Sequence, residues 1–248
     1  MSSCFIYVEK RVMKSIFKIA VGSSLLLSGT LAFTQAALAV DCLAVPNMGA
    51  WIDLGAAGCD DQDKNYVFGG ASGDAFDPTT ILSEWTFFQV GPDDVHQISL
   101  TPDPKPFQAA GVYNFWYSVE ITVPDRYFGT VSIDSDVPGE TPDVLVTKTL
   151  YANATDFSVG TFTGELVEVS SLSGTPDGPA NIPGRVPMIY VYETVAIDQG
   201  NAGEGSGDGG VNSITNTYTQ RQLPEPLSLS LLGIGIVGMA FARRRKVA

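Results

Sequence analysis

The stretch Val112-Tyr-Asn-Phe-Trp-Tyr-Ser-Val-Glu-Ile-Thr-Val123 decides the fold class of this chain. Every odd-numbered position from Tyr113 to Val123 is apolar or aromatic, whereas most of the even-numbered positions are polar. Because successive side chains of a strand point to opposite faces, this alternation predicts a strand with one buried face. The strand is expected to end at Pro124, whose nitrogen has no hydrogen to donate to a neighbouring strand.

Seven further runs rich in β-branched and aromatic residues also predict strands. They are Ile81–Val90, Gly129–Ile133, Val144–Tyr151, Phe157–Phe162, Glu165–Leu172, Met188–Ile197 and Val211–Thr219. Turn residues cluster between them, as at 134–139 and 173–179, and outside the two ends no long segment has the period of a helix. The sequence therefore predicts an all-β chain whose residues 40–222 form a single antiparallel β-sandwich, with a jelly-roll-like barrel as the alternative.

A glycine-rich segment, residues 200–210, interrupts this pattern near its end. Its composition is typical of a flexible linker, because glycine and serine give the chain many accessible conformations. We expect it to form a long hairpin loop between the strands around Met188 and Ile214.

Charge is distributed unevenly along the 248 residues, which carry 14 basic and 27 acidic side chains. Residues 1–39 and 227–248 together hold eight of the bases and one acid, so residues 40–226 have a net charge of −20. A body this acidic repels phosphate backbones, which excludes nucleic acid as a partner. The chain has one histidine, His96, which argues against most histidine-based catalysis and metal binding.

The N-terminal 39 residues have the layout of a secretory signal peptide. Basic residues up to Lys18 precede an apolar run that ends in Ala37-Leu38-Ala39. This small-x-small pattern predicts cleavage by signal peptidase between Ala39 and Val40. Met13 is an alternative start, and an uncleaved anchor helix is the alternative structure.

The C-terminal residues 223–248 predict a membrane-spanning helix. Sixteen residues without a charge, Leu227–Ala242, are followed by Arg243, Arg244, Arg245 and Lys246. Such a span is near the lower length limit for crossing a bilayer, and the basic cluster is expected to stay on the cytoplasmic side. This orientation leaves residues 40–226 outside, as the signal peptide also predicts.

The order of parts at this end resembles the PEP-CTERM sorting signal. The resemblance covers Pro224, Glu225 and Pro226, the helix that follows, and the three arginines. It implies a protein of a bacterium with an outer membrane, processed by the membrane enzyme exosortase and sorted to the cell surface or an exopolysaccharide matrix. A second, looser resemblance to such proteins lies in Gly58-Cys59 and Asp63-Lys64, with the aromatic residues after them.

Two of the three cysteines, Cys42 and Cys59, belong to the exported part, while Cys4 lies before or within the signal peptide. An even pair in an oxidising compartment predicts a disulfide bond. Sixteen residues lie between the two cysteines, so closing this loop contributes roughly 3 kcal/mol in the chain-entropy model. The spacing does not match a zinc site.

No motif for catalysis is evident. His96 follows two aspartates and is expected at the surface or a strand edge, and no Gly-x-Ser-x-Gly elbow supplies a nucleophile. The residues 61–72 fail as an EF-hand, although a looser calcium site could use aspartates of two clusters. The clusters are Asp60, Asp61 and Asp63, and Asp134 and Asp136. We expect no enzyme activity and no resident metal or cofactor.

Two functions fit these features. The first is an exported, non-catalytic surface or matrix protein associated with exopolysaccharide. The alternative is a carbohydrate-binding module or glycan hydrolase on the same β-sandwich. Four aromatic residues distinguish them, because rings exposed in a groove would stack on sugars whereas buried rings would belong to the core. These residues are Trp85, Trp116, Tyr113 and Tyr117.

Overall fold

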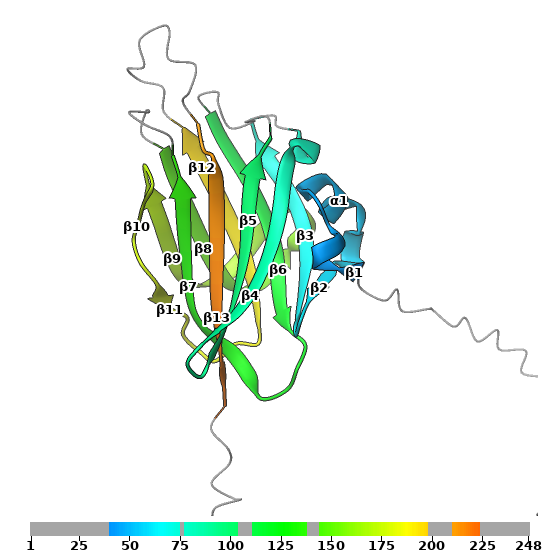
Figure 1. Ribbon diagram of the computed structural model, residues 1–248, viewed down its shortest axis with the longest axis vertical. Helices are drawn as coiled ribbons and strands as arrows, with labels where there is room; N and C mark the ends of the chain where they lie inside the picture. Colours follow the sequence, from blue (N-terminus) through cyan, green and yellow to red (C-terminus); the bar gives the residue numbers. More distant parts are fainter. Residues whose placement is uncertain (1–39, 75–76, 104–110, 138–143, 198–209, 224–248) are drawn as a thin grey trace, which may run out of the picture. The chain divides into compact units, whose positions relative to one another are not determined.

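Residues 40–74, 77–103, 111–137, 144–197 and 210–223 are described by a computed structural model, and they form two stacked β-sheets (Figure 1). The predicted signal peptide, its predicted cleavage site before Val40 and the tail from Pro224 onward lie outside these residues. Within the described ranges, no helix is long and apolar enough to cross a membrane.

The strands within these ranges are β1 (Val40–Asp41), β2 (Cys59–Asp61), β3 (Lys64–Gly73), β4 (Ile81–Val90), β5 (Asp93–Pro102), β6 (Gly111–Ile121), β7 (Arg126–Asp136), β8 (Val144–Asp156), β9 (Thr161–Leu172), β10 (Thr175–Pro176), β11 (Ala180–Asn181), β12 (Met188–Ile197) and β13 (Ser213–Gln222). The helices are α1 (Met48–Asp53) and four single turns of 3-10 helix, η1 (Cys42–Ala44), η2 (Gly55–Ala57), η3 (Pro78–Thr80) and η4 (Phe157–Val159).

One sheet has eight strands in the order β1-β2-β3-β6-β12-β8-β9-β10, and the other has five in the order β11-β7-β13-β5-β4, counting described residues. Every pairing among these strands is antiparallel except that of β1 with β2. The predicted antiparallel β-sandwich is therefore confirmed at the level of two stacked sheets.

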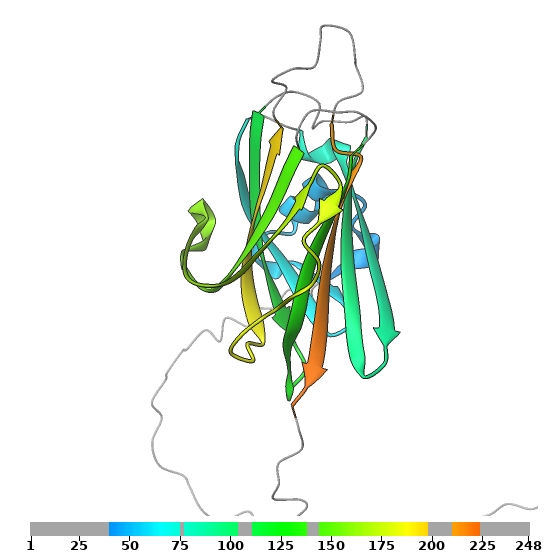
Figure 2. The same ribbon diagram turned by 90° about the vertical axis from the view of Figure 1, so that its left-hand side faces the viewer.

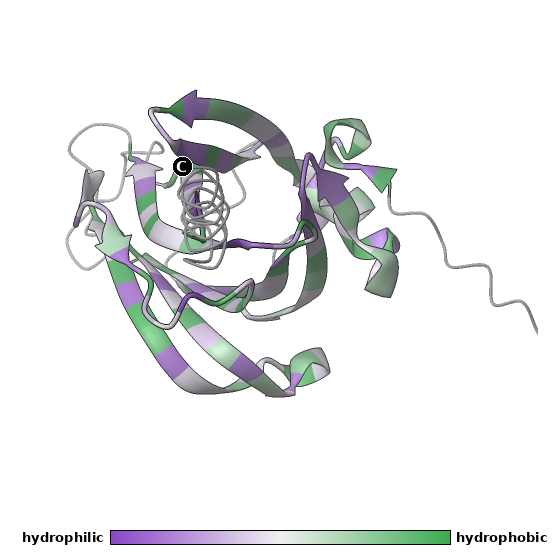
Figure 3. Cartoon of the chain, turned by 90° about the horizontal axis from the view of Figure 1, so that it is seen from below, coloured by the Kyte–Doolittle hydropathy of each residue, from purple (hydrophilic) through white to green (hydrophobic). Residues whose placement is uncertain are grey.

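The core lies between the sheets and is organised around β6. Tyr113, Phe115, Tyr117, Val119 and Ile121 are all buried on its inner face, as the alternation predicts. Figure 3 shows the same alternation of hydrophilic and hydrophobic residues along other strands. β6 pairs with β3 on one side and β12 on the other, so its inner face is at the middle of the eight-stranded sheet.

Strand boundaries follow the predictions closely for β4 and β12, which match them residue for residue. The predicted strand Phe157–Phe162 is wrong, because Phe157–Val159 forms η4 and β9 runs without interruption from Thr161 to Leu172. The side chain of Asp156 accepts from the Ser158 N–H, and Gly160 adopts a left-handed conformation that ends the turn.

The glycine-rich segment does not close a hairpin, which corrects the expectation above. β12 pairs with β6 and β8 in the eight-stranded sheet, whereas β13 pairs with β5 and β7 in the five-stranded sheet. The connection that contains residues 198–209 therefore joins the two sheets. Turn composition alone does not reveal whether the next strand pairs with the same sheet or crosses to the other.

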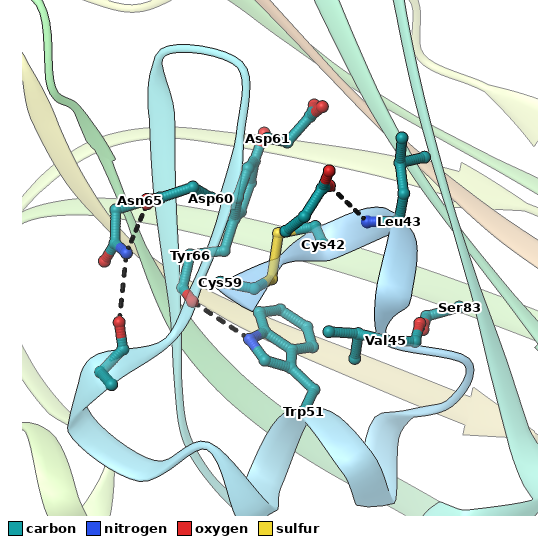
Figure 4. Close-up of a disulfide and its surroundings, with 12 residues drawn as sticks. Cys42, Leu43, Val45, Trp51, Cys59, Asp60, Asp61, Asn65, Tyr66 and Ser83 are labelled. Carbon is teal, nitrogen blue, oxygen red and sulfur yellow. Dashed lines mark hydrogen bonds between the residues drawn. A yellow bond between two sulfur atoms is a disulfide. The ribbon is translucent and has the colours of Figure 1, made fainter. Parts of the chain in front are cut away.

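A disulfide bond joins Cys42 and Cys59, as predicted, and ties the start of the domain to β2 (Figure 4). Between the two cysteines, α1 inserts the fully buried ring of Trp51 between the sheets, where its Nε1 donates to the Tyr66 carbonyl at 3.2 Å. The Trp51 ring lies 5.2 Å from that of Trp85. This segment also covers the start of the edge strand β4, since the Ser83 N–H donates to the Pro46 carbonyl.

Candidate functional site

The four aromatic residues that distinguish the two functions are all buried. Trp85 is 5% exposed, Trp116 is 4%, Tyr113 is 2% and Tyr117 is 1%. Trp85, Tyr113 and Tyr117 belong to the core between the sheets. None of the four presents a free ring to solvent, so a sugar cannot stack directly on these residues.

His96 is also buried, with no exposed surface, and lies in β5, an inner strand of the five-stranded sheet. The expectation of a surface or edge position is wrong. Its Nδ1 lies 2.9 Å from Asp61 Oδ2 and its Nε2 lies 3.5 Å from Asp63 Oδ1, so two carboxylates on the opposite sheet replace water as its neighbours. No serine contacts either nitrogen among the described residues, which leaves His96 without a nucleophile to activate.

Lys64 extends the polar contacts around His96. Its Nζ donates to Asp63 Oδ1 at 3.0 Å and to Gln220 Oε1 at 2.6 Å, and Gln220 Nε2 donates to both Asp63 and Asp94. Burial lowers the pKa of Lys64 to about 8, although the neighbouring aspartates oppose this shift. Burial alone would raise the pKa of Asp63, but hydrogen bonds from Gln220 and Lys64 hold it below its usual value. Lys64, Asp63, Gln220 and Asp94 are joined by hydrogen bonds as in a structural network, whereas His96 Nε2 is buried without a hydrogen-bond partner among the described residues.

Four of the five aspartates considered for calcium contact other side chains of the protein. Asp60 accepts from the Asn65 amide at 2.9 Å, and Asp61 and Asp63 face His96. Asp134 and Asp136 lie on strand β7 rather than in a loop, and Asp136 accepts from Asn212. In the part of the chain that the structure describes, no three histidine, cysteine or acidic side chains converge as a metal centre would require.

A group of rings lies on the other side of the eight-stranded sheet, facing away from the core. We call it the outer aromatic face. It consists of Trp116, Tyr151, Phe157, Phe162, Tyr190 and Tyr192, of which all except Trp116 are half-buried. The Trp116 and Tyr192 rings are nearly parallel with centroids 6.0 Å apart, and the Tyr151 and Phe162 rings stack at 5.2 Å. Tyr190 meets Phe157 edge-on at 5.6 Å. Phe162 lies 6.0 Å from Tyr190 and 6.1 Å from Tyr192, so the six rings form one connected group.

The β8–β9 hairpin shapes this face. Figure 2 shows the hairpin curving away from the other strands, with η4 at its tip. Trp116 Nε1 donates to the Phe157 carbonyl at 2.6 Å, which fixes the tip over the β6 side of the sheet. Gly70 and Gly160 allow this contact, since a β-carbon at either would lie within 3 Å of the Trp116 ring. The Trp116 ring therefore lies beneath the hairpin tip, and the half-buried rings of the outer aromatic face lie around it.

Polar side chains share the same face and the same rows of the sheet. Thr194 donates to Asn114 at 2.9 Å in the row next to Tyr192, and Thr149 donates to Glu168 at 3.1 Å in the row of Tyr192 itself. Burial, followed by the nearby Glu165 charge, raises the pKa of Tyr151. Its phenol therefore remains a neutral donor and acceptor at neutral pH. The face combines flat apolar rings with hydrogen-bonding groups.

One feature of the sequence already indicates the outer aromatic face, although it involves residues other than the four aromatic residues selected from the sequence. In Met188–Ile197 the odd positions Ile189, Val191 and Val195 are core residues, so Tyr190 and Tyr192 must point the other way. Two adjacent aromatics on the non-core side of one strand already indicate a ring-bearing surface. Their grouping with Phe162 and Trp116 depends on strand order and on the curved hairpin, which alternation does not encode.

No family model matches the chain, and no curated protein matches it either. Among solved structures, the chain is similar to one described as "Carbohydrate binding module family29", at 11% sequence identity and with a TM-score of 0.20. The match covers 67% of this chain and 97% of that one.

Proposed function

We propose that this chain is an exported, non-catalytic carbohydrate-binding protein whose outer aromatic face binds a polysaccharide. The observation that carries the proposal is the connected group of half-buried rings on one face of a sheet, with hydrogen-bonding side chains in the same rows. Binding sites for small organic groups have this composition, with apolar and aromatic walls and a few placed polar groups.

The chemistry of a sugar ring matches this composition. One side of a pyranose presents C–H groups that pack on an aromatic ring, while its rim presents hydroxyl groups that need hydrogen-bond partners. The rings of Tyr190, Tyr192 and Phe162 already hold one another in place, so binding would order few additional side chains and would lose little conformational entropy.

Charge favours a neutral polysaccharide. Glu120, Glu165 and Glu168 lie on or beside the outer aromatic face, and residues 40–226 have a net charge of −20. An acidic polymer would be repelled at low ionic strength, whereas a neutral glycan would not.

The absence of catalysis is part of the proposal. The only histidine contacts carboxylates in the interior, and Glu168 on the candidate face accepts a hydrogen bond from Thr149 rather than standing free. We therefore assign the face to binding and not to hydrolysis of the glycan.

Sorting by the tail completes the proposed function. We propose that signal peptidase removes residues 1–39, that the tail holds the protein transiently in the inner membrane, and that an exosortase then releases it to the cell surface or matrix. The resemblance of Pro224-Glu225-Pro226, the apolar stretch and the arginines to the PEP-CTERM signal supports this route. The Cys42–Cys59 disulfide suits an oxidising compartment outside the cytoplasm.

Affinity electrophoresis of the exported protein in gels containing neutral exopolysaccharide from the producing cells tests the binding proposal. We expect the wild type to be retarded and the Tyr190→Ala/Tyr192→Ala variant to lose roughly thirtyfold in affinity, since each of the two aromatic contacts is worth about 1 kcal/mol. Phe88→Ala, an exposed ring on β4 of the other sheet, is the matched control and should bind as the wild type does. Equal retardation of all three proteins, or none, would rule out the outer aromatic face.

A further inference from the structure

The core between the sheets contains a lysine, a glutamate and an asparagine that the proposed function does not use. Lys148 on β8, Glu193 on β12 and Asn216 on β13 have no exposed surface. Burying an ammonium and a carboxylate removes them from water at a large cost, which apolar residues at the same positions would avoid. A chemical role would explain why these buried polar side chains are present despite that cost.

Glu193 is placed to handle protons. Its Oε1 accepts from the Tyr117 hydroxyl at 2.5 Å, and its Oε2 lies 3.2 Å from Asn216 Nδ2. The Tyr117 hydroxyl also lies 2.6 Å from that of Tyr218, so two phenols fix the carboxyl group beside the carboxamide. Asn216 Oδ1 is buried and has no hydrogen-bond partner among the described residues. The carbonyl of this amide is thus open to a proton or an attacking atom.

Lys148 enters the same part of the core from the strand next to that of Glu193. It lies directly opposite Glu193 in the β8–β12 pairing, and its Nζ crosses to the five-stranded sheet. There the Nζ donates to the Ser132 carbonyl at 3.3 Å and lies 4.6 Å from the centroid of the Tyr218 ring. Ser132 pairs with Thr217, the residue between Asn216 and Tyr218. The amine is therefore beside the Asn216 segment of β13.

The protonation states suit an attack by the amine. Burial lowers the pKa of Lys148 to about 7 despite the opposing charge of Glu193, so a large share of the amine is neutral at neutral pH. Burial also raises the pKa of Glu193 against the opposing effects of Lys148, Tyr117 and Asn216, so a larger share of this carboxyl group holds a proton than in water at the same pH. A neutral amine is a nucleophile, whereas an ammonium is not.

From this cluster we propose that Lys148 and Asn216 form an intramolecular isopeptide bond, with Glu193 as the proton carrier. Lys148 Nζ attacks Asn216 Cγ to form a tetrahedral intermediate, and Glu193, whose Oε2 lies 3.2 Å from Asn216 Nδ2, donates its proton to that nitrogen. The carboxylate of Glu193 then takes a proton from the attacking nitrogen. The Cγ–Nδ2 bond breaks, one ammonia leaves, and the products are a secondary amide and the regenerated carboxylic acid. No oxidant, reductant or further reactant is needed.

The bond would join the two sheets covalently. Lys148 belongs to the eight-stranded sheet, and Asn216 belongs to the strand that leads into the tail. A cross-link there would resist separation of the sheets and would connect the C-terminal strand to the body of the domain, which suits a protein held at a surface outside the cytoplasm.

The second buried lysine provides a comparison within the same chain. Lys64 Nζ lies 2.6 Å from the carboxamide oxygen of Gln220, but it also forms an ion pair with Asp63 at 3.0 Å. The ion pair favours the protonated form of this amine, which is not a nucleophile. We therefore expect no cross-link between Lys64 and Gln220.

Intact-mass and tryptic-peptide mass spectrometry of the exported full protein test the proposal. We expect a mass lower than the disulfide-bonded sequence by one ammonia molecule. Trypsin should fail to cut after Lys148, and residues 127–185 should remain joined to residues 186–221 after reduction. Glu193→Gln and Lys148→Arg should each restore the lost ammonia, whereas Lys64→Arg should keep the cross-link.

The wild-type mass alone decides the question if a core variant fails to fold. A full mass with separate peptides would overturn the proposal. So would conversion of Asn216 to aspartate, because Glu193 would then activate water rather than the amine, and so would an ammonia loss that maps to any other pair of residues.

Discussion

Gly70 has no room for a β-carbon. Its ideal β-carbon would lie 2.5 Å from Cζ2 of Trp116, on the side of β3 where the hairpin tip closes over the sheet. We predict that Gly70→Ala lowers the free energy of unfolding by about 1–3 kcal/mol, because an added methyl group in a filled space forces the ring or the strand to move. Urea denaturation measures this loss. Ser72→Ala, at an exposed position of the same strand, is the control, and an equal midpoint for both variants would contradict the account.

The pH dependence of stability should report the burial of Lys64. Its pKa is about 8 in the folded protein against 10.5 for a free lysine, so between these values the unfolded chain binds a proton that the folded chain does not. The free energy of unfolding should therefore rise as the pH increases from about 8 to 10.5.

Lys64→Met removes this titration while keeping most of the side chain. We expect the rise with pH to be smaller in this variant than in the wild type, as measured by urea denaturation at several pH values. Parallel curves for the two proteins would show that Lys64 titrates normally in the folded state.

The disulfide fastens the N-terminal segment that carries α1. We predict that the Cys42→Ser/Cys59→Ser variant is less stable by roughly 3 kcal/mol, because the unfolded chain regains the freedom of the open loop. Thermal unfolding with and without a reducing agent measures the effect. The reducing agent should lower the midpoint of the wild type only, and an equal response of both proteins would contradict the role given to this bond.

Strands were predictable from the sequence where one face is uniformly apolar. β6 has that pattern, and β12 has it apart from Glu193, whereas β5 begins with Asp94 and His96 on its inward side and β3 begins with Lys64. His96 and Lys64 have partners across the sandwich, and Asp94 has partners on other strands of its own sheet. Alternation of hydropathy cannot show such partners. The sequence also could not show to which of the two sheets each strand belongs. The hairpin expected around residues 198–209 is the example, because β12 and β13 belong to different sheets.

The candidate site was only partly predictable. Alternation correctly placed Tyr113 and Tyr117 on the face that is buried, but it could not show that Trp116 on the other face lies beneath η4. That contact depends on a turn 41 residues further along the chain, which the sequence had presented as part of a strand.

At the scale of the whole molecule, the tail gives a prediction about processing. Matrix-associated protein from cells that contain the processing enzyme should lack Phe241 and Ala242, and replacing Pro224-Glu225-Pro226 should leave an anchored, unprocessed protein. The reason is the predicted partition of charge, with an acidic body outside and a basic cluster inside on either side of a short apolar span. Mass spectrometry of the C-terminal peptide measures the outcome. Recovery of the intact tail from the matrix would show that it is a permanent anchor.

The central claim is that the outer aromatic face binds a neutral polysaccharide. Hydroxyl-radical footprinting of the exported protein, with and without the exopolysaccharide of the producing cells, tests it most directly because it reports the accessibility of individual rings. We predict that oxidation of Tyr151, Phe162, Tyr190 and Tyr192 falls when the polysaccharide is added, while that of Phe88 on the opposite sheet is unchanged. Unchanged oxidation of the four rings, or protection centred on Phe88, would contradict the claim.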